Sequence, residues 1–243
     1  MDPNSVNIVN LPKLPPDAYT KDNRIAHAIA SKNRELRLHA LKTAPEAFAS
    51  SFEQEVERDL SDTLERLKTV HADHFFAVDR SVSPWMPERS EEFFSNLIEA
   101  TWVGMIVLIG PLSPSGSAAM SAKHDPLTKD GSGRGLLAAE QTRTGELSYH
   151  INGTFVDPEA RGAGLGRAMI ETAVAKGWAE AFKRGLRLHC TVLVDSENAA
   201  AMNLYNSTGF CAVGEEIYVQ QPRTRMGEWK ADERVAIRME LWL

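Results

Sequence analysis

The sequence has few cysteines, two among its 243 residues, at Cys190 and Cys211. Both stand in runs with the residue preferences of β-strands, and their spacing is not that of a metal site. We therefore predict two buried free thiols. A chain of this length can bury an adequate hydrophobic core without disulfide bonds.

Long apolar segments are also absent. The longest apolar run extends from Val103 to Ile109, which is too short to span a bilayer. Residues 1–5 carry neither the basic segment nor the apolar core of a signal peptide. We expect a cytoplasmic protein in a reducing, intracellular compartment, with no membrane partner.

The chain has no excess of basic residues. It contains 27 Lys and Arg against 33 Asp and Glu, for a formal net charge of −6. A large nucleic-acid-binding surface needs clustered positive charge, so we expect no nucleic-acid partner. The hydrophobic content of 43% and the charged content of 25% are typical of a globular protein.

The most informative segment that is present reads Arg161-Gly162-Ala163-Gly164-Leu165-Gly166. It stands between a strand-like run, residues 153–158, and a helix-like run, residues 165–182. Glycine permits a sharp turn and the close approach of a ligand, and a helix start offers unpaired amides and positive dipole charge. The segment predicts a nest for an anion, most simply a diphosphate, with a plain strand-to-helix turn as the alternative.

The spacing of these glycines excludes two other phosphate loops. A dinucleotide-binding loop needs Gly-x-Gly-x-x-Gly, and here the third glycine comes one residue early. A loop of the nucleoside triphosphatase kind ends in Gly-Lys-Ser/Thr, whereas Gly166 is followed by Arg167-Ala168. The spacing therefore argues against a nucleotide-binding regulator.

Two segments together resemble the GCN5-related N-acetyltransferase (GNAT) superfamily. Val156–Gly166, which begins Val-Asp-Pro-Glu and continues with Arg-x-x-Gly-x-Gly, resembles the acyl-CoA-binding motif of that family. Asp195–Tyr205, followed by Gly209-Phe210, resembles its Asn…Ala…Leu-Tyr…Gly-Phe segment. The resemblance is good over residues 146–220 and fair around residues 33–55.

The resemblance implies an α/β (α+β) fold in a single domain over residues 1–243. We expect a central mixed, mostly antiparallel sheet of six to seven strands, splayed in the middle and flanked by helices on both faces. Residues 111–143, rich in Pro, Gly and Ser, are predicted to form a flexible insertion or a lid.

Hydrophobic periodicity and capping signals give the expected elements. The predicted strands cover residues 5–9, 74–78, 102–109, 146–152 with the strand-like run 153–158, 186–194, 211–219 and 234–242. The predicted helices cover residues 22–42, 91–98 and 165–183, together with a helix opened by an Asp62/Glu65 capping box and one capped by Asp195 or Ser196. Gly153 is predicted to mark a bulge that opens its strand from a neighbour.

The resemblance also implies the cosubstrate, acetyl-CoA, and no metal. Main-chain amides of the glycine segment would hold the CoA diphosphate, and the main chain of two strand residues would pair with pantetheine. The residues that we expect to bind the cofactor are Phe155, Val156, Arg161, Gly162, Ala163, Gly164, Leu165, Gly166, Arg167, Asn198 and Tyr205.

The candidate catalytic residues are Tyr205, His150 and Glu146. Tyr205 is expected to protonate the CoA thiolate, with a half-buried tyrosine whose hydroxyl meets water as the alternative. His150 has a suitable ordinary pKa for a base. It shares one polar strand face with Glu146, and that face is predicted to line a wet cleft or the protein surface. An ordered water is the third candidate for the base.

These observations predict transfer of an acetyl group from acetyl-CoA to a primary amine, by direct attack within a ternary complex. A small-molecule amine is favoured as the acceptor over a histone, because the chain has no basic tail. A CoA-binding protein without transferase activity, or a transferase for a larger acyl group, stays open. The C-terminal strand could support a homodimer.

Overall fold

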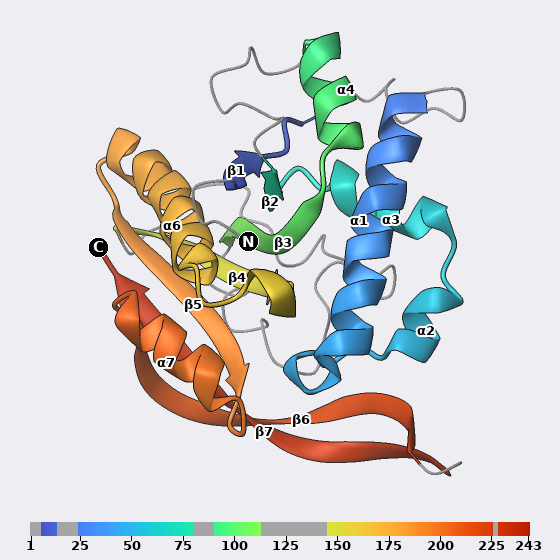
Figure 1. Ribbon diagram of the computed structural model, residues 1–243. Helices are drawn as coiled ribbons and strands as arrows, with labels where there is room; N and C mark the ends of the chain where they lie inside the picture. Colours follow the sequence, from blue (N-terminus) through green and yellow to red (C-terminus); the bar gives the residue numbers. More distant parts are fainter. Residues whose placement is uncertain (1–5, 14–23, 80–89, 113–144, 226–227) are drawn as a thin grey trace.

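The structure is a computed structural model that describes residues 6–13, 24–79, 90–112, 145–225 and 228–243 (Figure 1). The predicted insertion, beyond its first two residues, lies outside the described residues. Within the described ranges, no helix combines the length and apolar character that crossing a bilayer requires.

The described strands form one seven-stranded sheet in the order β1-β2-β3-β4-β5-β7-β6. Every neighbouring pair is antiparallel except β4 and β5, which are parallel, as expected of a mixed, mostly antiparallel sheet. The strands are β1 Val6–Asn10, β2 Ala72–Asp79, β3 Trp102–Leu112, β4 Glu146–Val156, β5 Arg187–Asp195, β6 Cys211–Arg225 and β7 Glu228–Trp242.

The sheet splays between β4 and β5. Their pairing ends at Ile151 opposite Val192, whereas β4 continues to Val156 and β5 stays paired with β7 up to Asp195. Gly153 has a φ of 63°, and the β3–β4 register shifts by one residue next to it. The predicted bulge is therefore present, and it lies where the two strands part.

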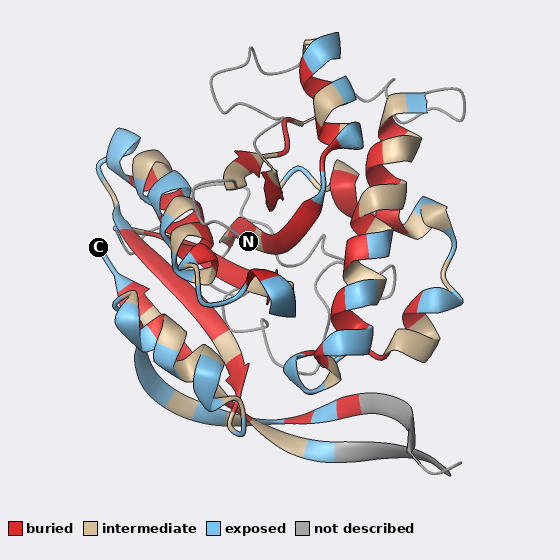
Figure 2. Ribbon diagram, viewed as in Figure 1, coloured by how far each residue is buried: buried red, intermediate tan, exposed pale blue. Residues whose placement is uncertain are grey.

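Helices cover both faces of the sheet, as expected (Figures 1 and 2). Phe75 packs in the cluster that contains residues of α6 and α7, and Phe76 packs in the cluster built from α1, α3 and α4. Successive strand residues point to opposite faces, so the two clusters are two separate core layers. The helices are α1 Arg24–Thr43, η3 Pro45–Ala47, α2 Phe52–Val56, α3 Leu60–Lys68, α4 Glu91–Glu99, η5 Pro158–Ala160, α6 Leu165–Lys183 and α7 Ala199–Ser207.

Both predicted helix caps are wrong. α3 begins at Leu60, with extended Asp59 as its N-cap, so the Asp62/Glu65 capping box does not form. α7 is capped by Asn198, whose side-chain oxygen accepts from the Ala201 amide at 3.0 Å. Asp195 is not the N-cap: its carboxylate accepts from the Glu197 amide at 2.9 Å, before the helix begins, and from the side chains of Tyr218 on β6 and Arg234 on β7.

One expectation about the C-terminal strands needs correction. Cys190 is buried as predicted, but Cys211, the first residue of the edge strand β6, is exposed. The final strand, β7, lies between β5 and β6 and is paired with both, and a homodimer through it stays a prediction.

A buried carboxylate joins the first three helices. Glu55 on α2 is 3% exposed and contacts Arg66 on α3, Arg37 on α1 at 3.1 Å and Arg58 at 3.8 Å. Burial alone would raise the pKa of Glu55, but Arg37 and Arg66 outweigh it and hold the pKa at about 2. Glu55 therefore stabilises this layer only in its ionised form.

We predict that Glu55→Gln lowers the free energy of unfolding at pH 7 by about 3 kcal/mol, because three guanidinium groups lose their shared anion. The folded pKa lies below the ordinary value of 4.5. The contribution of Glu55 is therefore complete above that value and is lost as the pH falls toward 2. Urea unfolding at pH 7 and at pH 3.5 measures both effects. Between pH 7 and pH 3.5, the free energy of unfolding should fall less for the variant than for the wild type.

The control is Glu65→Gln, which removes an exposed carboxylate that pairs with Lys68 at 2.8 Å. Exposed pairs contribute little, so its unfolding free energy should stay within about 0.5 kcal/mol of the wild type. Equal values for Glu55→Gln and Glu65→Gln would contradict the role given to Glu55.

Candidate active site

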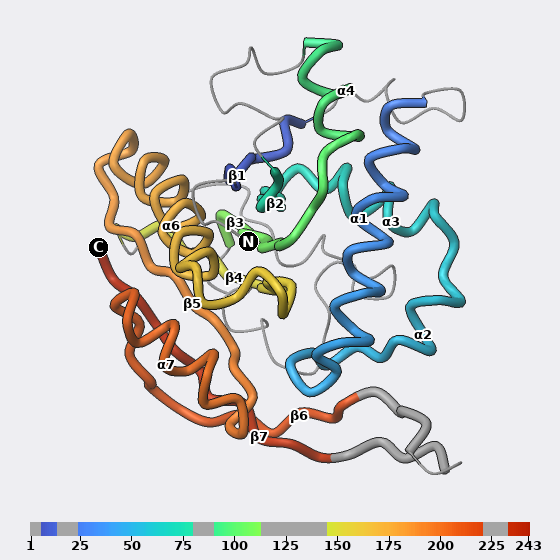
Figure 3. Tube along the Cα trace, viewed as in Figure 1, coloured from blue at the N-terminus to red at the C-terminus, as the bar shows by residue number. Residues whose placement is uncertain are grey.

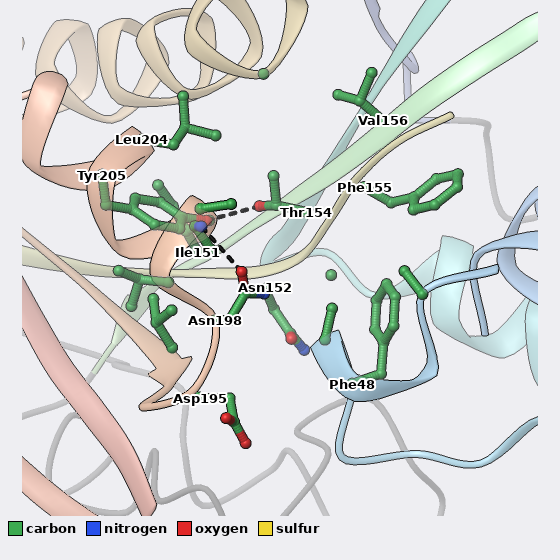
Figure 4. A pocket seen from close by; sticks show the side chains of 18 of the residues that line it. Phe48, Ile151, Asn152, Thr154, Phe155, Val156, Asp195, Asn198, Leu204 and Tyr205 are labelled. Carbon is green, nitrogen blue, oxygen red and sulfur yellow. Dashed lines mark hydrogen bonds between the residues drawn. The ribbon is translucent and has the colours of Figure 1, made fainter. Parts of the chain in front are cut away.

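A cavity of about 600 Å³ lies where β4 and β5 part (Figure 4). Its walls come from the end of α1 and the loop after it, the second half of β4, the glycine segment, the end of β5, and α7. Of the predicted site residues, the cavity lining contains His150, Phe155, Val156, Arg161, Gly162, Gly164, Leu165, Gly166, Arg167, Asn198 and Tyr205.

The glycine segment forms an elbow, residues 161–166, whose conformation requires glycine at two positions. Gly162 and Gly164 have φ values of 81° and 77°, and an added Cβ at either would meet no described atom within 4 Å. Gly164 is the N-cap of α6 and supplies no side chain to the first helix amides. Those amides therefore stay available to an anion.

Gly166 has a different reason to be glycine. A Cβ there would lie 3.0 Å from Cδ2 of Leu204, so this residue allows α6 and α7 to pack closely. Leu165 is buried in the core beside it, and Ala163 packs against the same cluster without lining the cavity.

The two arginines of the elbow already have partners. Arg161 donates from Nε to the Val156 carbonyl at 3.0 Å, and Arg167 donates from Nε to Glu171 at 2.8 Å. The Val156 carbonyl, which we expected to pair with pantetheine, thus accepts from Arg161 in this structure. The Phe155 side chain is 3% exposed and packs in the core, as expected.

Tyr205 is buried, with 3% of its surface exposed, and so is not the half-buried tyrosine of the alternative. Its hydroxyl lies 2.8 Å from Oγ1 of Thr154, on the part of β4 that has separated from β5 (Figure 4). Burial raises the pKa of the Tyr205 phenol, against the smaller effect of the Thr154 hydrogen bond. The phenol is therefore protonated at neutral pH and can donate a proton into the gap.

His150 is buried and lines the same cavity. Its Nδ1 lies 2.9 Å from Oγ1 of Thr191, and that hydroxyl donates to the Tyr149 carbonyl. Because the Thr191 proton is used in this way, His150 donates from Nδ1 and keeps an unprotonated Nε2. Burial lowers the pKa of His150 to about 4, so the ring is neutral at pH 7.

The polar face of β4 is more buried from solvent than predicted. Ser148 is 6% exposed, and its Oγ lies 3.4 Å from Nδ1 of His189 on the neighbouring β5. His150 and Asn152 line the cavity, whereas Glu146, at the opposite end of the strand, is not among the described lining residues. The parallel pairing with β5 places His189 and Thr191 beside Ser148 and His150 and excludes solvent from half of this face.

Sequence analysis missed a buried carboxylate at the end of β5. Asp195 lines the cavity and accepts from the Tyr218 hydroxyl at 2.6 Å and from Nε of Arg234 at 2.6 Å. Burial would raise the pKa of Asp195, but the hydrogen bonds from Arg234 and Tyr218 lower it. Nothing local in the sequence indicates these partners, because they lie on β6 and β7.

A second contact that sequence reasoning did not predict holds the β6–β7 hairpin against a loop that lines the cavity. Gln220 on β6 is buried and donates from Nε2 to the Phe48 carbonyl at 2.9 Å. Phe48 belongs to the loop after α1 and lines the cavity. The β6–β7 hairpin therefore passes beside this loop, as the trace in Figure 3 shows.

The described residues contain no group of three or more His, Cys, Asp or Glu side chains that could hold a metal ion. The cavity lining includes a buried phenol, a neutral imidazole and the glycine elbow.

The model of the acetyltransferase (GNAT) family matches residues 58–210, more than half of the chain. The protein belongs to this family, and the resemblance found in the sequence is confirmed.

Comparisons with individual proteins agree with the family. The chain is 38% identical over 74 residues to a mycothiol acetyltransferase of Acidothermus cellulolyticus, a match that covers 30% of this chain and 21% of that relative. The match thus spans about a fifth of the length of that relative.

Solved structures share the fold at low sequence identity. A putative acetyltransferase from Salmonella typhimurium, solved with acetyl-CoA, has a TM-score of 0.50 and 16% identity, over 97% of this chain and 92% of the other. A putative acetyltransferase from Acinetobacter baylyi has a TM-score of 0.52 and 12% identity, over 98% and 93% of the two chains. The expected fold class is confirmed.

We predict that nitrogen NMR of histidine-labelled protein finds His150 neutral at pH 6, with its proton on Nδ1. The physical reason is burial, which opposes the charged ring, together with the hydrogen bond to Thr191. Thr191→Val should leave the ring neutral but remove its preference for one tautomer, and His150→Gln assigns the signal. A ring that is protonated at pH 6 in the wild type would refute the assignment of a neutral base.

Proposed function

We propose that this protein transfers an acetyl group from acetyl-CoA to a primary amine, which attacks the thioester directly within a ternary complex. The observation that carries the proposal is the position of the Tyr205 hydroxyl. It lies against Thr154 in the gap between the parted strands, in the cavity that the glycine elbow also lines. A thioester whose CoA tail binds at the elbow would place its sulfur within reach of this phenol.

The elbow holds the cofactor in this proposal. The first amides of α6 and those of the glycine turn bind the diphosphate, and Arg161 and Arg167 add positive charge near it. The main chain of Phe155 and Val156 pairs with pantetheine after Arg161 releases the Val156 carbonyl. Support comes from the open space at two elbow glycines and from the separation of β4 from β5.

The amine reaches the thioester from the other side of the cavity. We propose His150 as the base, because the residue lines the cavity and its ring is neutral at pH 7. It takes a proton from the incoming ammonium group directly or through a water. Glu146 lies outside that lining, which favours His150 over it.

The acceptor in this proposal is a small molecule. Gln220 joins the β6–β7 hairpin to the loop of Phe48, a lining residue, through a buried hydrogen bond, and this contact supports a site for a small amine over one for a long peptide.

Acetyl-CoA binding tests the elbow. Gly164→Ala should weaken the binding of acetyl-CoA, measured by calorimetry, by about tenfold or more, because the new methyl group separates the diphosphate from charge-assisted amide hydrogen bonds. Gly185→Ala is the matched control. Gly185 also has a positive φ, 65°, with open space around it, and it follows the other end of the same helix. Both substitutions place an alanine at a positive φ and so destabilise the backbone by a similar amount. Equal affinity of the two variants for acetyl-CoA would therefore refute the elbow as the diphosphate site.

A thiol-release assay with acetyl-CoA over a panel of amines then tests the transfer. Release of CoA that depends on one of the amines is expected. Tight binding of acetyl-CoA without release for any amine would instead identify a CoA-binding protein without transferase activity.

Tyr205→Phe should lower kcat by about a hundredfold and leave acetyl-CoA affinity unchanged, because it removes the proton donor but keeps the buried ring. The control is Tyr149→Phe. Tyr149 is also buried, but it lies on β4 and packs toward α6. Steady-state kinetics of both variants make the comparison. A kcat for Tyr205→Phe equal to that of Tyr149→Phe would remove Tyr205 from the mechanism.

A further inference from the structure

The cavity has two sides, which Figure 4 shows. The elbow packs on the side of Val156 and Leu204, because an added Cβ at Gly166 would lie 3.8 Å from Val156 and 3.0 Å from Leu204. Phe48 and Asp195 line the opposite side (Figure 4). That side is available to the acceptor amine. We call its lining the acceptor wall, which consists of the lining residues within 37–50 together with Asp195, Tyr218 and Ala236.

The carboxylate of the acceptor wall has its hydrogen-bonding positions filled. Oδ1 of Asp195 accepts from the Glu197 amide at 2.9 Å and from Nη2 of Arg234 at 2.8 Å. Oδ2 accepts from the Tyr218 hydroxyl at 2.6 Å and from Nε of Arg234 at 2.6 Å. A carboxylate offers about four lone-pair positions, and these four bonds use them. A ligand cation would therefore have to displace a partner that the protein already provides.

The guanidinium group of the wall also has a carboxylate beside it. Nε of Arg37 lies 3.1 Å from Glu55, whose side chain is 3% exposed, and Nη2 of Arg37 donates to Oγ of Ser50 at 3.1 Å. The charge of Arg37 is thus offset within the protein. Glu46 is the third charged residue of the described wall, but it is exposed, and solvent screens its charge. The charges of the wall therefore do not call for a charged group on the ligand.

Much of the remaining wall is apolar. The β6–β7 hairpin contributes Tyr218 and Ala236, and the loop after α1 contributes Phe48 and three alanines, Ala44, Ala47 and Ala49. Gln220 donates to the Phe48 carbonyl at 2.9 Å, and Tyr218, two residues earlier, points to the same face of β6. Two aromatic residues from different elements therefore line the same side of the cavity.

Apolar surface favours apolar groups, whereas a charged group that is buried without a partner loses its hydration at a large cost. We infer that the acceptor is a primary amine whose body is uncharged and apolar, and that Phe48 and Tyr218 pack against this body. The inference rests on the proposed function, since it names the class of amine that the same cavity accepts. Polyamines and amino acids, which carry a second charged group, are then poor acceptors.

The first test compares three amines of equal length in the thiol-release assay with acetyl-CoA. Pentylamine ends in a methyl group, 1,4-diaminobutane in an ammonium group and 5-aminopentanoate in a carboxylate, on the same chain of methylene groups. We expect kcat/KM for pentylamine to exceed both other values by at least about tenfold, because desolvation opposes the binding of the second charge. A higher value for the diamine or for the amino acid would overturn the inference and indicate a cation or an anion site in the wall.

The second test adds a charge to the wall. Ala47 is exposed, so Ala47→Asp is compatible with folding. It should raise the ratio of kcat/KM for 1,4-diaminobutane to that for pentylamine about tenfold or more, with KM for acetyl-CoA unchanged, as one charged hydrogen bond predicts. Ala175→Asp, at an exposed position of α6 outside the described lining, is the control and should leave the ratio unchanged. Equal ratios for the two variants would contradict the inference.

The third test removes apolar surface. Phe48→Ala should raise KM for pentylamine about tenfold or more, with KM for acetyl-CoA unchanged, because the amine loses contact with a buried ring. Phe52→Ala is the control, because Phe52 packs against the same core cluster from outside the described lining. Equal effects of the two variants would overturn the role of Phe48, and Ala47→Asp tests the wall if Phe48→Ala does not fold. The absence of thiol release with these amines and with the wider panel would instead refute the proposed transfer itself.

Discussion

The whole site depends on the point at which β4 and β5 stop pairing. Up to Ile151 and Val192 the two strands satisfy each other's backbone groups, and beyond it they separate around the bulge at Gly153. Backbone amides and carbonyls that face a gap need other partners, because leaving them unpaired in a buried place is costly. Arg161 supplies one of these partners, and the amide groups of an extended ligand could supply the others.

Two buried carboxylates hold the walls of this gap in position. Glu55 joins α1, α2 and α3 on one side, and Asp195 joins the end of β5 to β6 and β7 on the other. Each is ionised because arginines oppose the effect of burial. The cavity is therefore bounded by polar contacts that hold particular side chains in place, which is what positions a phenol accurately.

Local signals in the sequence were sufficient for the elbow, the bulge and most elements. Gly162, Gly164 and Gly153 all have positive φ, so the glycine at each position is itself the signal for the local backbone conformation. Contacts between distant residues have no such signal. The bond between Thr154 and Tyr205 joins residues 51 positions apart, and that between Phe48 and Gln220 joins residues 172 apart. The predicted helix caps were wrong for a local reason, since residues a few positions away, Asp59 and Asn198, are the N-caps of α3 and α7.

Burial acts in opposite directions on the two groups proposed to move protons. It lowers the pKa of His150 and raises the pKa of Tyr205, so both are uncharged at pH 7. An uncharged imidazole can accept a proton and an uncharged phenol can give one, which are the two transfers that aminolysis of a thioester requires. Burial thus keeps both groups uncharged, while it lowers the basicity of the imidazole and the acidity of the phenol. The hydroxyl groups of Thr191 and Thr154 form hydrogen bonds with them.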